Sequence, residues 1–233
     1  MSSFRRRQML AAGVLKGEDK LWERVQYISR SIQNSAIDLG IATAANLNVE
    51  VHLVDFNQWA AGGWGGNIIS AYQETNTARF SIWANNTDTA YMRCGYGNAP
   101  DYVAGQYEWT DASFGSETIL ERRGADVYID GSYAITSFGT FTAEPGITLC
   151  LGGKDFSDGC FPAKFADVIV RTQYGGPIIA HFIPVKILSE GPNDQLGRTI
   201  AVGAGCLYDL VTNQFYAATY GSDFVAGPSV PTE

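Results

Sequence analysis

The 233-residue chain is long enough for one large domain, and its 45% hydrophobic and 17% charged residues exclude a disordered chain. Its 26 glycines and its 12 Phe, 12 Tyr and 5 Trp favour short strands joined by tight turns, which excludes collagen, coiled coils and long helical bundles. The net charge of −8 leaves an acidic body behind a basic first segment, so we expect no nucleic-acid partner.

Residues 1–20 read as a basic arm that is separate from the core. A triplet of arginines precedes a short apolar stripe: Arg5, Arg6, Arg7, Met9 and Leu10. Charge paired with a small apolar surface predicts an anchor on a partner protein, and a disordered arm is the alternative. The segment lacks the apolar stretch of a secretory signal peptide. No apolar run in the chain reaches the ~18–20 residues of a membrane helix, so we expect no membrane insertion.

From residue 21 to 233 the chain reads as a single sandwich domain. Short segments with a period of two predict strands near 23–28, 36–41, 49–56, 67–73, 78–84, 89–96, 116–123, 126–131, 146–152, 164–172, 178–188, 205–212 and 213–218. Glycine-rich and polar clusters such as 61–67 and 189–197 predict the turns between them. Many strands without helices between them favour an all-β, antiparallel two-sheet sandwich.

Three segments resemble the concanavalin A-like and laminin G-like jelly rolls of bacteriophage virion proteins and gut-bacterial surface proteins. The first is a strand that ends in an Asp-Gly turn, Val127 to Gly131, and the second is the opening hairpin after residue 22. The third is the C-terminal block, which matches at Phe182, Ile183, Pro184, Gly205, Leu207, Tyr208, Asp209, Asn213, Phe215, Tyr216, Gly227 and Pro228. The resemblance covers roughly residues 22–228 and departs at segments 30–34, 61–67 and 191–205.

The resemblance implies a jelly-roll fold and a function outside catalysis. It implies a structural, decoration or fibre protein of a phage virion, assembled in the host cytoplasm, that contacts host-surface glycans. The arm would then bind other virion proteins, and a homo-oligomer is compatible with such a role. A bacterial carbohydrate-binding or adhesion module and a glycan-cleaving enzyme are the alternatives.

The last hairpin has a structural rationale of its own. Asp209 can accept backbone N–H groups of the turn that follows it, and Asn213 tolerates the left-handed conformation that reverses the chain. We therefore expect a structural role for this motif and no chemistry.

The sequence offers no persuasive catalytic set, so we predict that the protein is not an enzyme. The two histidines, His52 and His181, each lie within a predicted strand, and packed or hydrogen-bonded strand histidines are the expected interpretation. Glu117 and Glu121 form the nearest carboxylate pair for glycoside hydrolysis. Because Arg122 and Arg123 follow at once, a solvated and salt-bridged face suits this segment equally well.

We expect no cofactor. Asp155 and Asp158 offer two hard oxygen ligands in one loop, so a calcium site is the alternative to ordinary turn-forming aspartates. The four cysteines, Cys94, Cys150, Cys160 and Cys206, lack a CxxC spacing, which favours reduced core thiols over a zinc site or a disulfide scaffold.

Aromatic residues in two predicted loops are the candidate ligand site. The glycine-rich loop carries Trp59 and Trp64 ahead of Asn67, and a second loop carries Tyr107 and Trp109. Exposed flat rings beside amides are typical of platforms that stack sugar rings, whereas buried rings would belong to the core or to a subunit interface. The sequence leaves both interpretations open.

Overall fold

The computed structural model describes residues 20–30, 35–56, 65–72, 79–85, 91–97, 103–108, 116–136, 141, 143, 145–152, 163–219, 221 and 223–231. Across these ranges the chain forms strands and connecting turns, with no α-helix. Within the same residues, no helix has the length and apolar character needed to cross a membrane. The arm at residues 1–20 lies outside the described residues, except for Lys20.

The strands follow one another as β1 (Trp22–Arg24), β2 (Ile28–Arg30), β3 (Ile37–Ala42), β4 (Asn48–Val54), β5 (Gly65–Tyr72), β6 (Arg79–Asn85), β7 (Tyr91–Gly97), β8 (Val103–Glu108), β9 (Glu117–Arg123), β10 (Asp126–Ile129), β11 (Ser132–Thr136), β12 (Thr148–Leu151), β13 (Lys164–Arg171), β14 (Ile178–Ile187), β15 (Ala204–Asp209), β16 (Gln214–Tyr216) and β17 (Phe224–Ala226). They form an 11-stranded sheet and a 6-stranded sheet, and every pairing between these strands is antiparallel. The predicted all-β, two-sheet architecture is confirmed; the jelly-roll connectivity stays a prediction.

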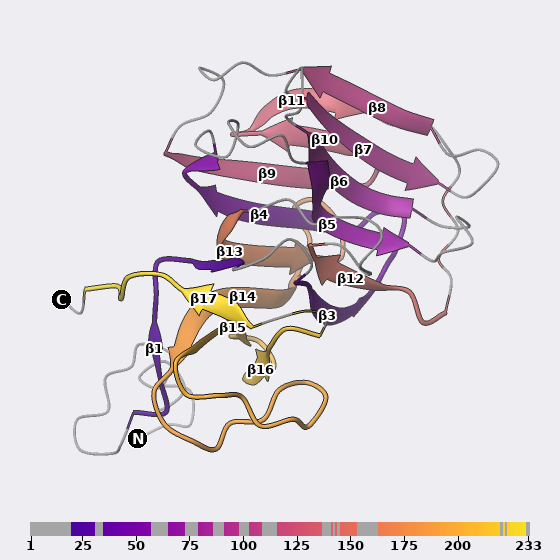
Figure 1. Cartoon of the computed structure of the whole chain (residues 1–233). Helices are drawn as coiled ribbons and strands as arrows, with labels where there is room; N and C mark the ends of the chain where they lie inside the picture. Colours follow the sequence, from indigo (N-terminus) through magenta and orange to yellow (C-terminus); the bar gives the residue numbers. More distant parts are fainter. Residues whose placement is uncertain are drawn as a thin grey trace.

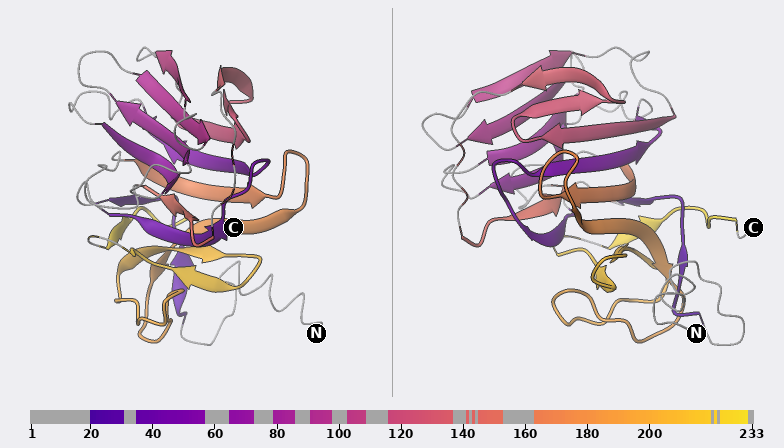
Figure 2. Two further views of the ribbon diagram at one scale, coloured as in Figure 1. Left: turned by 90° about the vertical axis from the view of Figure 1, so that its right-hand side faces the viewer. Right: turned by 180° about the vertical axis from the view of Figure 1, so that it is seen from behind.

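The smaller sheet has the order β3-β12-β5-β6-β7-β8. In the larger sheet, β11-β10-β9-β4-β13 run side by side, and β13 then pairs with both β14 and β2. Because β14 pairs with β15, β15 with β17 and β17 with β2, these five strands close a ring of pairings. Figures 1 and 2 show β15, β16 and β17 at the end of the molecule opposite to β7 and β8.

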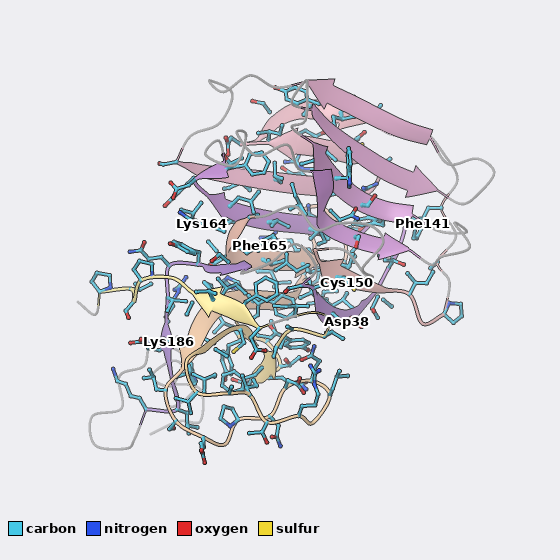
Figure 3. All side chains as sticks on the ribbon, viewed as in Figure 1. Asp38, Phe141, Cys150, Lys164, Phe165 and Lys186 are labelled. Atoms are coloured by element: carbon cyan, nitrogen blue, oxygen red, sulfur yellow. The ribbon has the colours of Figure 1, made fainter. Side chains whose placement is uncertain are left out.

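One hydrophobic core lies between the sheets. It joins residues of the larger sheet, such as Val51 and Phe165, to residues of the smaller sheet, such as Ile69 and Phe80. Alternation along β13 is visible at two labelled residues in Figure 3, since Phe165 is fully buried whereas its neighbour Lys164 forms a 2.6 Å ion pair with Asp55. This period of two is what the sequence pattern predicted.

A second, smaller core lies under β1, β14 and β15. Trp22 stacks on Tyr208 with ring centroids 5.0 Å apart, and Ile183, Val185 and Ile187 pack around the pair. Cys206 of β15 belongs to this cluster, and burial raises the pKa of its thiol. Cys94 and Cys206 are buried free thiols, as expected, and Cys150 is buried in β12. Cys160 lies outside the described residues.

Two predicted loops contain strands instead. Gly65 to Asn67 opens β5, where Gly65 pairs with Asn85 and Asn67 with Trp83. Val103 to Glu108, predicted as part of an aromatic loop, forms β8 and pairs with β7. Glycine weakens a strand by itself, but ladder hydrogen bonds to a neighbouring strand compensate for that weakness, so the glycine content of these segments was misleading.

Candidate functional site

A β-bulge in β13 brings a polar cluster to the outer face of the larger sheet. Phe165 pairs with Leu53 and Val168 with Val51, so Ala166 and Asp167 together lie opposite the single residue His52. Phe165 and Val168 are both buried, whereas Ala166 and Asp167 are partly exposed. The extra residue therefore preserves the hydrophobic register on either side and re-aims Asp167 outward. The larger sheet faces the viewer in the right-hand view of Figure 2.

Asp167 joins a strand histidine to an arginine from the edge strand β1. The Nη2 atom of Arg24 lies 3.2 Å from Oδ1 and 3.3 Å from Oδ2, and the Nε2 atom of His181 lies 3.2 Å from Oδ2. Burial by itself would raise the pKa of Asp167, but the hydrogen bond with His181 and the positive charge of Arg24 outweigh it and hold the pKa below its ordinary value. Asp167 is thus kept ionised.

The second histidine of the chain, His52, lies close to the same cluster. It lies in β4 beside the bulge, and its Nε2 atom is 3.7 Å from Oε2 of Glu50. His52 and Arg24 are among the residues that line a cleft of about 460 Å³. The cleft is lined by Arg24, Val25, Gln26, His52, Leu53, Val54, Glu117, Thr118, Ile119, Asp130, Ala166, Asp167 and Val230.

The charges of this cleft disfavour an anionic ligand. The cleft is lined by three carboxylates, those of Glu117, Asp130 and Asp167, and by one guanidinium, that of Arg24. Asp167 already neutralises Arg24 through their ion pair. An anion would meet net negative charge here, whereas hydroxyl groups can donate to the carboxylates and accept from Arg24. Within the described part of the chain, no group of three His, Cys, Asp or Glu residues is arranged to hold a metal ion.

Few of the predicted ligand residues fall within the described part of the chain. Asn67 is 5% exposed in β5, and Tyr107 in β8 is partly buried against the core. The other predicted site residues lie outside the described residues; they are Trp59, Trp64 and Trp109, the calcium candidates Asp155 and Asp158, and the arm residues Arg5, Arg6, Arg7, Met9 and Leu10.

The carboxylate pair of β9 separates in the structure. Glu117 is exposed at the cleft, whereas Glu121 is 8% exposed and accepts hydrogen bonds from Arg123 at 2.6 Å and from Asn48 at 2.8 Å. The predicted salt bridge is present between Glu121 and Arg123. The prediction that Arg122 also lies on a solvated face is wrong, because Arg122 is fully buried. Because successive residues of a strand point to opposite faces of the sheet, Arg122 and Arg123 cannot both lie on the solvated face.

His52 and His181 are predicted from the sequence as separate strand residues, and Asp167 is not among the predicted site residues. The structure brings all three together because β13 lies between β4 and β14. One signal was available in the sequence: the run Phe165-Ala-Asp-Val168 breaks the alternation of a strand by one residue, as a bulge does.

We expect Asp167→Asn to lower the stability at pH 7 and to weaken its dependence on pH. Because the folded pKa of Asp167 is lowered, its contribution is fully present above the unfolded pKa of about 4 and is lost as the pH falls through the lower folded value. Urea unfolding from pH 7 down to acid tests this, and the difference between wild type and variant should be largest at pH 7 and shrink below about pH 4. A difference independent of pH would contradict the assignment.

Comparisons with known proteins give fold-level likenesses alone. No family model and no curated protein matches the chain. Among solved structures, it is similar to the enzymatically active domain of tailspike protein 2 of bacteriophage CBA120, with 10% identity and a TM-score of 0.43 over 62% of this chain. The full-length tailspike protein 2 from an Escherichia coli O157:H7 bacteriophage matches with 10% identity and a TM-score of 0.39 over 67% of this chain. The matches span about a quarter of those longer chains, 25% and 27% respectively.

Proposed function

We propose that the protein is a non-enzymatic component of a phage virion whose sandwich domain contacts host-surface glycans through the outer-face cleft. The observation that carries the glycan assignment is the cleft itself. It sets carboxylates, a guanidinium and an imidazole around about 460 Å³ on an open sheet face, with net negative charge. The virion assignment rests on the resemblance of the C-terminal block around Phe182 and Asp209.

The ionisation of the described carboxylates supports binding over hydrolysis. A glycosidase needs a carboxylic acid whose pKa is raised so that it can protonate the leaving oxygen. Burial works in that direction at Asp167 and Glu121, yet hydrogen bonds from His181 to the first and from Arg123 to the second lower both pKa values. Both groups are thereby unsuited to act as acids, and Asp167, which lines the cleft, is suited to accept hydrogen bonds from hydroxyls.

The cleft assignment predicts the effect of two exposed charges. Arg24→Ala and Glu117→Ala should each weaken glycan binding by about 10- to 100-fold, since a charge-assisted hydrogen bond contributes about 1.5–3 kcal/mol. A glycan array of bacterial surface polysaccharides identifies the ligand, and calorimetry with the strongest hit measures the affinities. Leu196→Ala, an exposed residue in the 188–203 loop, is the matched control and should bind as wild type does.

Several outcomes would overturn the proposal. A wild-type protein that binds nothing on the array, or binding that both cleft substitutions leave unchanged, would reject the cleft. Release of shortened sugar products during long incubation would reject the non-enzymatic assignment in favour of a glycan-cleaving enzyme. Absence of the protein from purified phage particles, examined by mass spectrometry and electron microscopy, would favour a bacterial adhesion module.

A further inference from the structure

Three tyrosine rings lie around and beside Arg123 on the outer face of the larger sheet, where no site was predicted from the sequence. The guanidinium carbon of Arg123 lies 3.8 Å from the ring centroid of Tyr128 and 3.6 Å from that of Tyr174. Tyr133 extends the row, because its ring meets that of Tyr128 edge to face at 5.8 Å. We call Arg123, Tyr128, Tyr133 and Tyr174 the tyrosine row.

The tyrosine row is held in place but left open to solvent. Tyr128 and Tyr133 belong to the β10–β11 hairpin and pair directly across it, while Tyr174 stands in the turn after β13. Tyr133 is 59% exposed and Tyr174 is 61% exposed. Arg123 packs against one side of the Tyr174 ring, so the remaining surface of that ring faces outward.

The charge of the row is already neutralised. Nη2 of Arg123 donates to Oε2 of Glu121 at 2.6 Å, and this hydrogen bond is the main cause of the raised pKa of Arg123. Glu121 in turn accepts from Asn48 at 2.8 Å. The positive charge of the guanidinium is therefore balanced by its carboxylate, which weakens its attraction for a free anion.

Neutral hydrogen-bonding groups border the row. A hollow of about 250 Å³ is lined by Asn46, Arg123, Gly124, Gln173 and Tyr174. Asn46 and Gln173 are exposed, and their amides can donate to and accept from hydroxyls. Gly124 has a φ of +58°, and an added Cβ would lie 2.9 Å from the Ala45 carbonyl oxygen, so this wall of the hollow needs glycine.

The hollow and the cleft lie at opposite ends of one strand, β4. Glu50 and His52 are outward residues of β4 on the way from the cleft to Asn48, and Arg171 pairs with Glu50 between the two places. The four residue-to-residue steps from His52 to Asn48 cover about 13 Å at the ordinary rise of a strand. A chain of several sugar units spans such a distance, whereas a monosaccharide does not.

We propose that the tyrosine row and its hollow form a second subsite that stacks a neutral sugar ring, so that the ligand is a neutral oligosaccharide lying along the outer face from the cleft to Tyr174. The inference rests on the proposed function and adds the ligand class, neutral and extended. Ring faces recognise the apolar side of a pyranose, and the amides of Asn46 and Gln173 bind its hydroxyls. Acidic sugars are disfavoured because the arginine at each end of this path is already paired with a carboxylate, Arg24 with Asp167 and Arg123 with Glu121.

The test compares short and long members of the same neutral series by titration calorimetry. The probes are maltose with maltohexaose, cellobiose with cellohexaose, and chitobiose with chitohexaose, together with the matching pair from the strongest array hit. We expect Tyr174→Ala to weaken hexasaccharide binding about tenfold while changing disaccharide binding less than twofold. Tyr174→Phe keeps the ring and should bind as wild type does. Glu117→Ala, in the cleft, should weaken both lengths.

The outcomes separate this inference from the proposed function. Wild-type binding with no effect of Tyr174→Ala, or an equal loss for both lengths, overturns the second subsite and leaves the cleft intact. No sugar binding by wild type rejects both. Preference for acidic over neutral hexasaccharides overturns the ligand class, and Tyr174-dependent binding of a polyproline peptide in place of sugars assigns the row to a protein partner. An unchanged melting temperature confirms that Tyr174→Ala, at an exposed turn, is folded.

Discussion

Replacing Arg122 with alanine is expected to lower the free energy of unfolding by about 3–5 kcal/mol. Arg122 is the largest fully buried side chain described, and it crosses from β9 into the smaller sheet. Its Nη1 atom donates to the Ser81 carbonyl at 2.5 Å, its Nε atom donates to the Gly124 carbonyl at 2.8 Å, and its guanidinium lies 4.1 Å from the centre of the Phe80 ring. Alanine would leave two carbonyls without these donors and a cavity between the sheets.

Urea unfolding at pH 7 measures this loss, and two variants serve as references. Arg24→Ala removes a half-exposed arginine from a surface pair with Asp167 and should cost less than about 1 kcal/mol. Arg122→Lys keeps the charge but cannot reproduce the planar, two-carbonyl geometry, so we expect an intermediate loss. A loss below about 1 kcal/mol for Arg122→Ala would show that the free-energy cost of burying the guanidinium equals the stabilisation from its contacts.

The strands of this fold were predictable because their side chains alternate. β4 places valine and leucine inward at every second position, and β13 does the same with valine after its bulge, so the pattern is local. β8 was missed because it carries the small residues Ala104 and Gly105 and few apolar ones, so its strand character comes from pairing with β7. Pairing between strands is a tertiary property that a local pattern does not contain.

The candidate site was less predictable than the fold, for a physical reason. Arg24, His52, Asp167 and His181 come from four strands, and only the sheet order brings β4, β13 and β14 side by side. Tyr174 likewise reaches Arg123 from 51 positions further along the chain. The predicted aromatic platform for sugars at Trp59, Trp64 and Trp109 stays a prediction, because these residues lie outside the described part of the chain.

The hairpin between β15 and β16 shows the opposite case, in which local chemistry was sufficient. As predicted, Asp209 accepts the backbone N–H of Val211 at 3.0 Å and of Thr212 at 3.2 Å, and Asn213 adopts a left-handed φ of 60°. The structure adds a contact that the sequence did not indicate. The N–H of His181 in β14 also donates to Asp209, at 2.9 Å. The carboxylate therefore ties the turn to the strand that carries the site histidine.

We therefore expect Asp209→Ala to lower the free energy of unfolding by about 2–5 kcal/mol. Asp209 is 1% exposed, and alanine would leave the N–H of His181 without this acceptor inside the sheet and remove the hydrogen bond with the Thr212 hydroxyl at 2.7 Å. Asp209→Asn keeps the shape and one acceptor oxygen, so its loss should be smaller. Thr212→Val removes only the hydroxyl bond and should cost about 1 kcal/mol.

Because His181 holds Asp167 at the cleft, Asp209→Ala should also weaken the proposed glycan binding at temperatures where the protein is still folded, whereas Thr212→Val should not. Equal stability of Asp209→Ala and wild type in urea would show that the hairpin is held by the packing of Tyr208 and Phe215 alone.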